Sequence, residues 1–94
     1  MRNLVISPAV LEKITAKHSV TPLEVEQCFE NRSGPYVLDE TEEHQTDPPT
    51  LWFIAPTTRN RVLKVIFVFR DGNVFLKSAY DPSKAAVELY DKVS

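Results

Sequence analysis

Apolar residues recur at helical spacing in three segments of the chain, and each segment follows a capping residue and a proline. Ser7-Pro8, Thr21-Pro22 and Asp81-Pro82 are typical of a helix start. The side-chain oxygen accepts a hydrogen bond from a free N–H of the first turn, and proline has no N–H to leave unpaired there. Glu24 also completes a capping box with Thr21. The predicted helices cover about residues 8–17, 22–31 and 82–93.

Between the second and third helices the pattern becomes typical of strands. The nearly continuous apolar run over 62–69 indicates a central strand that is covered on both faces. The turn at 71–73 then predicts an antiparallel hairpin with a strand over 74–80. Shorter candidate strands cover residues 36–38 and 51–55 and, at the sheet edge, residues 4–6.

This order of elements predicts an α+β protein with one domain over residues 1–94. We expect two N-terminal helices, a three- to four-stranded antiparallel sheet and a C-terminal helix. Residues 39–50, which are rich in acidic side chains, are expected to form a mobile loop. Cys28, the one cysteine, lies among apolar positions of a predicted helix and is expected to pack in the core.

Charge is distributed unevenly along the chain, although the net charge is only −2. Residues 24–47 carry eight acidic residues and one arginine, whereas residues 59–77 carry five basic residues and one aspartate. The acidic segment would suit a basic protein partner, and the basic segment would suit phosphate. Both segments are also consistent with solvated faces that have no partner.

Several classes of function lack any motif in the sequence. There is no glycine-rich phosphate loop, no nucleophile elbow and no His/Cys spacing for zinc. We therefore predict no cofactor and no metal. No apolar stretch approaches the ~20 residues of a membrane span, and no signal peptide is evident, so the predicted location is the cytoplasm, without membrane contact.

Basic residues in the predicted hairpin are the main candidates for chemistry. Lys64 and Lys77 each interrupt an apolar strand, and a charge there must reach either water or a partner. The lysines either extend into solvent at an edge or form a phosphate-binding face with arginines of the same segment. Metal-independent RNA cleavage needs a base, cations near the phosphate and an acid.

The candidates for this chemistry divide into two groups. The catalytic candidates are Lys17, His18, Arg61, Lys64 and Tyr80, and the RNA-binding candidates are Arg59, Arg70, Lys77 and Trp52. Proton transfer is open between His18, Tyr80, Glu42 and His44. Trp52 and Tyr80 are equally typical of packing residues, and His18 of a helix end. Trp52 is included because an aromatic side chain can stack a base.

Short motifs carry a resemblance to a known family. Lys17-His18-Ser19-Val20 and the capped helix that follows resemble the Lys-His-Gly-Val segment of the BrnT toxins, which are small RelE-like ribonucleases. The segments 61–65 and 77–80 and a final helix with Tyr90 are similar to the second half of those toxins. The resemblance spans about residues 8–92. The chain departs from it at Ser19, which replaces a glycine, and at Tyr80, which replaces an arginine.

A second resemblance is to short bacterial proteins that share Ser7-Pro8, 17–20, 47–50 and 52–54 with this chain. Those proteins carry the label ADP-ribosyl-(dinitrogen reductase) hydrolase.

The first resemblance implies a RelE/BrnT-like fold and a toxin-like endoribonuclease that cleaves RNA without metal and is inhibited by a protein antitoxin. The rival hypothesis is a non-catalytic module on the same fold, which binds a basic protein through residues 24–47. Hydrolysis of ADP-ribose is the third. The sequence does not indicate an oligomeric state.

Overall fold

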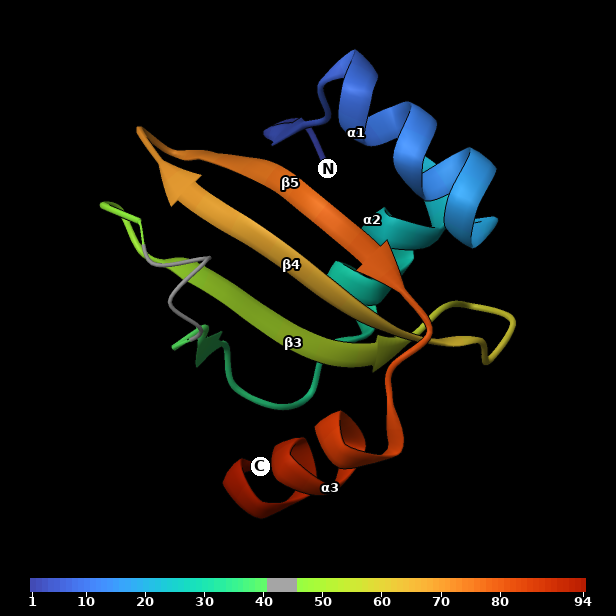
Figure 1. Ribbon diagram of the computed structural model, residues 1–94, viewed down its shortest axis with the longest axis vertical. Helices are drawn as coiled ribbons and strands as arrows, with labels where there is room; N and C mark the ends of the chain where they lie inside the picture. The colour runs from blue at the N-terminus through green and yellow to red at the C-terminus, as the bar shows by residue number, and fades with distance from the viewer. Residues whose placement is uncertain (41–45) are drawn as a thin grey trace.

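Five strands form one mixed sheet in the order β1-β5-β4-β3-β2 (Figure 1). The computed structural model describes residues 1–40 and 46–94. β1 runs parallel to β5, and all other neighbouring strands are antiparallel. The predicted α+β class is confirmed, but the sheet has five strands rather than three or four, and it is mixed rather than antiparallel throughout because β1 runs parallel to β5. The strands are β1 (Leu4–Val5), β2 (Val37–Leu38), β3 (Thr50–Pro56), β4 (Val62–Arg70) and β5 (Asn73–Tyr80).

The first two predicted helices are confirmed. The first comprises α1 (Pro8–Glu12), which continues as one π-helical turn, η1 (Lys13–Lys17). The second is α2 (Pro22–Asn31), and its capping box is complete: Glu24 donates its backbone N–H to the Thr21 hydroxyl at 3.2 Å and accepts from the backbone N–H of Thr21 at 3.0 Å. The start of α2 is fixed by these local bonds, which is why the sequence located it.

The third predicted helix starts two residues later than expected. α3 covers Lys84–Val93, and the Ser83 hydroxyl caps it by accepting from the backbone N–H of Ala86 at 3.1 Å. The predicted cap at Asp81 is wrong because its carboxylate instead pairs with Arg61, 3.2 Å away. The Asp81 side chain, which is largely exposed, thus pairs with Arg61 instead of capping α3.

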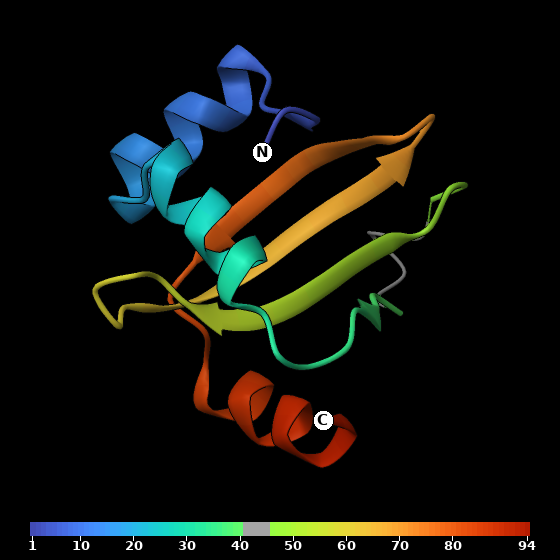
Figure 2. The same cartoon turned by 180° about the vertical axis from the view of Figure 1, so that it is seen from behind.

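One face of the sheet is covered by α2, which crosses it in both views (Figures 1 and 2). Phe29 of α2 packs edge-to-face on Phe53 and Phe67, with ring centroids 4.8 and 5.3 Å apart. Cys28 is fully buried beside them, so its predicted core role is confirmed, and burial raises the pKa of its thiol to about 12. This face holds most of the hydrophobic core, which continues into Ile14 of η1 and Val20 of the connection between η1 and α2.

The opposite face is covered only in part, by α3 alongside β3 (Figure 1). Tyr90 is the buried residue of α3: its ring lies 5.6 Å from that of Trp52, and its hydroxyl donates to the Pro35 carbonyl at 2.7 Å. Gly34 allows this approach, since a Cβ there would lie 2.5 Å from the Tyr90 hydroxyl. We call this side of the sheet, which carries Trp52, the open face.

A β-bulge changes which side chains of β5 lie on the open face. Ile66 pairs with Ser78 and Phe67 with Leu76, so Lys77 has no partner residue on β4. Two consecutive residues of β5 therefore oppose one residue of β4. Beyond the bulge the alternation is reversed, and Tyr80 shares a face with Ser78 and Ile66 rather than with the buried Leu76.

The predicted acidic loop is described only at its two ends. Residues 41–45, which include Glu42 and His44, lie outside the described residues. At one end Asp39 is only 9% exposed and donates its backbone N–H to the Thr50 carbonyl at 2.8 Å. At the other end the Thr46 hydroxyl lies 3.1 Å from that of Thr50. No helix within 1–40 or 46–94 is long and apolar enough to cross a membrane.

Candidate functional site

Three lysines and a histidine meet at a hollow on the open face, where the end of η1 lies against β5. The hollow has a volume of about 550 Å³, and Thr50 and Ile66 of the sheet are among the residues that line it. None of the described residues that line it is acidic, so we call it the basic hollow. Its polar lining comprises Lys13, Lys17, His18, Thr50, Lys77, Ser78 and Tyr80.

The rings of His18 and Tyr80 lie side by side in this hollow. Their centroids are 5.2 Å apart and the ring planes are inclined at 45°. Burial raises the pKa of the Tyr80 phenol, and the nearby Asp39 carboxylate raises it further. Tyr80 therefore keeps its proton at neutral pH and can donate a hydrogen bond.

The bulge explains why so many polar groups of β5 line one hollow. In a regular strand Lys77, Ser78 and Tyr80 could not all lie on the same face, because successive side chains alternate. The extra residue brings all three into the lining. The carbonyl of Lys77 accepts a hydrogen bond from the Lys13 ammonium at 2.8 Å, which ties the first helical segment to the bulge.

Arg61 lies behind the hollow rather than in it. Its guanidinium donates to the main-chain carbonyls of Ser19 at 2.6 Å and His18 at 2.9 Å. It also pairs with Asp81 at 3.2 Å and Glu24 at 3.5 Å. The hydrogen bond from Arg61 to Asp81 is the main reason that the pKa of Arg61 is raised. Arg61 thus fixes the backbone that carries His18, a role the sequence analysis did not assign to it.

Lys64 and Trp52 lie next to the basic hollow, on the side of α3. Lys64 pairs with Tyr80 across the β4–β5 ladder, and its ammonium is 4.7 Å from the centroid of the Trp52 ring. Trp52 is only 5% exposed and packs on Tyr90. Lys64 therefore has a cation–π partner, and Trp52 presents little surface for stacking a base.

The two remaining predicted arginines lie at different places. Arg70 is at the hairpin end of β4, where its guanidinium carbon is 5.1 Å from the centroid of the Phe75 ring. Arg59 lies in the exposed turn between β3 and β4 and lines a hollow with Glu24 and Gln27 of α2. The structure thus brings Lys17, His18, Lys77 and Tyr80 together and leaves Arg59, Arg61, Lys64, Arg70 and Trp52 outside the basic hollow.

Lys13, Thr50 and Ser78 contribute to the polar lining of the basic hollow and were not among the sequence-based candidates. Lys13 precedes Lys17 by four positions, and this spacing places both on one side of a helix. That signal was present in the sequence. Ser78 carried no such signal, because its position depends on the bulge.

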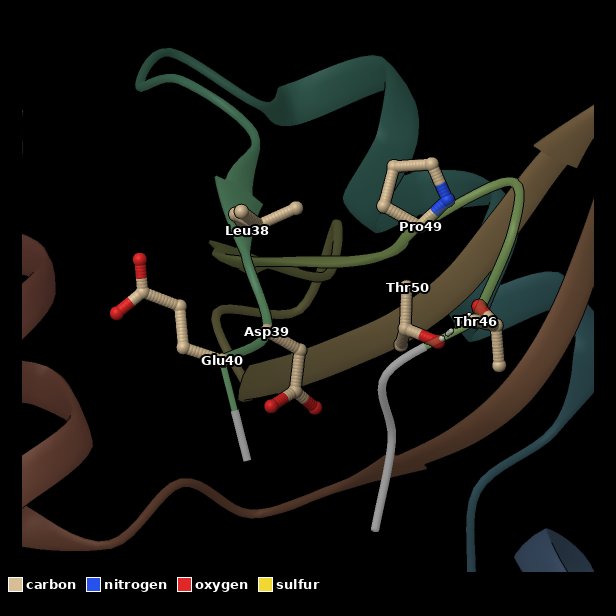
Figure 3. A pocket seen from close by; sticks show the side chains of 6 residues that line it. All are labelled: Leu38, Asp39, Glu40, Thr46, Pro49 and Thr50. Carbon is tan, nitrogen blue, oxygen red and sulfur yellow. Dashed lines mark hydrogen bonds between the residues drawn. The ribbon is translucent and has the colours of Figure 1, made fainter. Parts of the chain in front are cut away.

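An acidic hollow adjoins the basic one and shares Thr50 with it. Asp39, Glu40 and Thr46 contribute to its lining, and its volume is about 540 Å³. Figure 3 shows the Thr46 and Thr50 hydroxyls directed toward each other, with the Glu40 side chain extending away from them. The acidic and basic hollows therefore border each other at Thr50.

Comparison with known proteins adds no family assignment: no family model matches the sequence, and no curated protein matches it significantly. Within the described part of the chain, no three His, Cys, Asp or Glu side chains lie close enough together to hold a metal ion.

Proposed function

We propose that this protein is a toxin-like endoribonuclease that cleaves single-stranded RNA at the basic hollow without a metal. The observation that carries the proposal is the convergence of His18, Tyr80 and three lysines on one hollow of about 550 Å³. The order of the elements and the Lys-His-Ser-Val motif at 17–20 support a BrnT-like protein of the RelE-like superfamily.

The proposed reaction moves two protons and exchanges one P–O bond for another. His18 accepts the proton of the ribose 2′-hydroxyl, and the 2′-oxygen attacks the adjacent phosphorus. The bond from phosphorus to the 5′-oxygen breaks, and Tyr80 or protonated His18 supplies a proton to that oxygen. The products are a 2′,3′-cyclic phosphate and a 5′-hydroxyl, and neither water nor an oxidant is consumed.

The lysines supply the electrostatic part of this mechanism. Charge builds up on the non-bridging oxygens of the phosphorus in the transition state, and fixed cations stabilise it. Lys17 and Lys77 line the basic hollow together with the His18–Tyr80 pair. The hydrogen bond from the Lys13 ammonium to the Lys77 carbonyl holds η1 against β5, so the three lysines stay close together.

The test is cleavage of an unstructured RNA oligonucleotide in excess EDTA. We expect cleavage by the wild type, products with cyclic phosphate ends, and none with an oligonucleotide that has a 2′-deoxyribose at the cut site. His18→Gln should slow cleavage by about 10²- to 10⁴-fold, the usual contribution of a general base. Tyr80→Phe tests the donor, because it removes only the hydroxyl.

Lysine variants provide matched controls for charge. Lys17→Ala should lower the rate of cleavage. Lys92→Ala removes the same charge from the exposed end of α3 and should leave the rate of cleavage unchanged. Expression of the wild type in bacteria should arrest growth, and His18→Gln should not. Intact RNA with the wild type at micromolar protein, or equal cleavage by His18→Gln, would falsify the proposal.

A second candidate function is a non-catalytic module that binds a basic protein. The hollow between α3 and β2 supports it, because Leu38 and Leu89 are about half exposed there and Asp39 and Glu40 lie beside them. A lysine-rich amphipathic peptide should then bind, more weakly at 500 mM than at 50 mM salt. Leu89→Ser should weaken binding, and the exposed Leu23→Ser on α2 should not. Hydrolysis of ADP-ribose gains no support from the described residues.

A further inference from the structure

A smaller hollow of about 160 Å³ lies on the same open face, nearer the β4–β5 turn. Lys77 lines both this hollow and the basic one, so the two adjoin. The proposed cleavage chemistry does not use the smaller hollow. Its other lining residues include Asp47, Val68, Arg70 and Phe75.

Flat side chains form one wall of the smaller hollow. Phe75 is half-buried and pairs with Val68 across the ladder, and the Arg70 guanidinium lies over its ring at 5.1 Å. Aromatic rings and guanidinium planes are the surfaces on which proteins stack the unpaired bases of single-stranded RNA.

The charges of the hollow favour a base over a second phosphate. Asp47 contributes a carboxylate, which repels phosphate but can accept a hydrogen bond from a base amino group. Lys77, at the boundary with the basic hollow, is placed to contact the phosphate between two nucleotides. A nucleotide chain that runs along the open face would thus alternate phosphate and base in register with these groups.

We propose that the Phe75–Arg70 hollow is a nucleobase subsite, which stacks the base next to the phosphate held in the basic hollow. This inference rests on the proposed function and deepens it: the substrate is single-stranded RNA of at least two nucleotides, and affinity depends on the second base. Stacking on Phe75 contributes to binding, while the reacting groups remain His18 and Tyr80.

The test uses fluorescence anisotropy to measure the binding of 2′-O-methyl oligoadenylates of one to four nucleotides, which cannot be cleaved. Wild-type affinity should rise with the second nucleotide. Phe75→Ala should weaken binding of the trimer by about 5- to 100-fold, the usual effect of removing one stacking ring. It should leave binding of the mononucleotide unchanged, and Phe75→Trp should retain the wild-type affinity.

Phe69→Ala is the matched control, since Phe69 is an exposed phenylalanine of the same hairpin whose partner Val74 belongs to the core face. It should bind as the wild type does. If Phe75→Ala unfolds, Phe75→Leu removes the flat ring while keeping an apolar side chain. Equal trimer affinity for the wild type and a folded Phe75→Ala or Phe75→Leu variant overturns the subsite alone. Failure of the wild type to bind any oligonucleotide overturns both the subsite and the proposed function.

Discussion

The guanidinium of Arg61 donates a hydrogen bond to the carbonyl of His18 across 43 positions of the chain, at 2.9 Å. The same group binds the Ser19 carbonyl, Glu24 and Asp81. Arg61, which directly precedes β4, therefore connects the segment after η1, the start of α2 and the segment before α3. A side chain that resembles a phosphate ligand in the sequence is in fact the link that sets the position of His18.

Replacing Arg61 should reveal this link. Arg61→Ala should lower the free energy of unfolding by about 2 kcal/mol, because it leaves two carbonyls and a half-buried carboxylate without their charged donor. Arg61→Lys should restore less than half of the free energy of unfolding that Arg61→Ala loses, because an ammonium lacks the planar donor geometry needed to reach all these acceptors. Urea denaturation measures both effects. Arg59→Ala, two residues away in an exposed turn, should change stability by less than about 0.5 kcal/mol. Equal losses at the two positions would contradict the assigned role.

Ser19 occupies a backbone conformation that suits glycine. Its φ is +53°, and the turn there is closed by the Val20 N–H, which donates to the Ile14 carbonyl at 2.8 Å. Left-handed conformations are strained for residues with a Cβ. Ser19→Gly should therefore raise the free energy of unfolding by about 0.5–1 kcal/mol. Ser83→Gly makes the same chemical change at φ −70° and removes a helix cap. It should therefore lower the free energy of unfolding by a few tenths of a kcal/mol.

Gly34 and Tyr90 should be energetically coupled. Gly34→Ala places a Cβ against the Tyr90 ring and should cost about 1–3 kcal/mol, with a change in the near-ultraviolet circular dichroism of Trp52, which contacts Tyr90. In a Tyr90→Ala background the same change should cost almost nothing. A double-mutant cycle measures the coupling. Additive effects would show that Gly34 does not determine how α3 docks.

The buried thiol of Cys28 should make the fold sensitive to alkali. Its pKa is raised from 9.0 to about 12 mainly by burial, so the folded state resists losing this proton. The contribution to stability is complete below pH 9 and is lost as the pH rises toward 12, by up to about 1.4 kcal/mol per pH unit. Cys28→Ala lacks this group, so its stability deficit relative to the wild type should shrink above pH 9 in urea titrations. A constant deficit from pH 8 to 11 would contradict the shift.

Local signals explain most of what the sequence predicted correctly. The capping box at Thr21 and Glu24 and the tight turn before β5 act within a few residues, so α2 and the hairpin could be located without knowing the rest of the fold. The start of α3 could not, because the preference of Asp81 for a cap competes with an ion pair to Arg61, 20 positions away.

The candidate site was predictable only in part for the same reason. The Lys-His pair at 17–18 and the basic hairpin were visible, but their meeting depends on the bulge at Lys77. Strict alternation from the buried Leu76 would place Ser78 and Tyr80 toward α2. The sequence contains no turn residue or glycine at that point that would indicate the change of face.

Because of the bulge, β5 contains one residue more than its pairing with β4 requires, and the faces of the neighbouring side chains do not depend on that residue. Lys77 has no opposite residue, while Leu76 and Ser78 pair with consecutive residues of β4. Deleting Lys77 would close the ladder and leave every neighbouring side chain facing as it does now. A homologous gene could therefore lose or acquire this positive charge through a single in-frame codon deletion or insertion, without rearranging the hydrophobic interior.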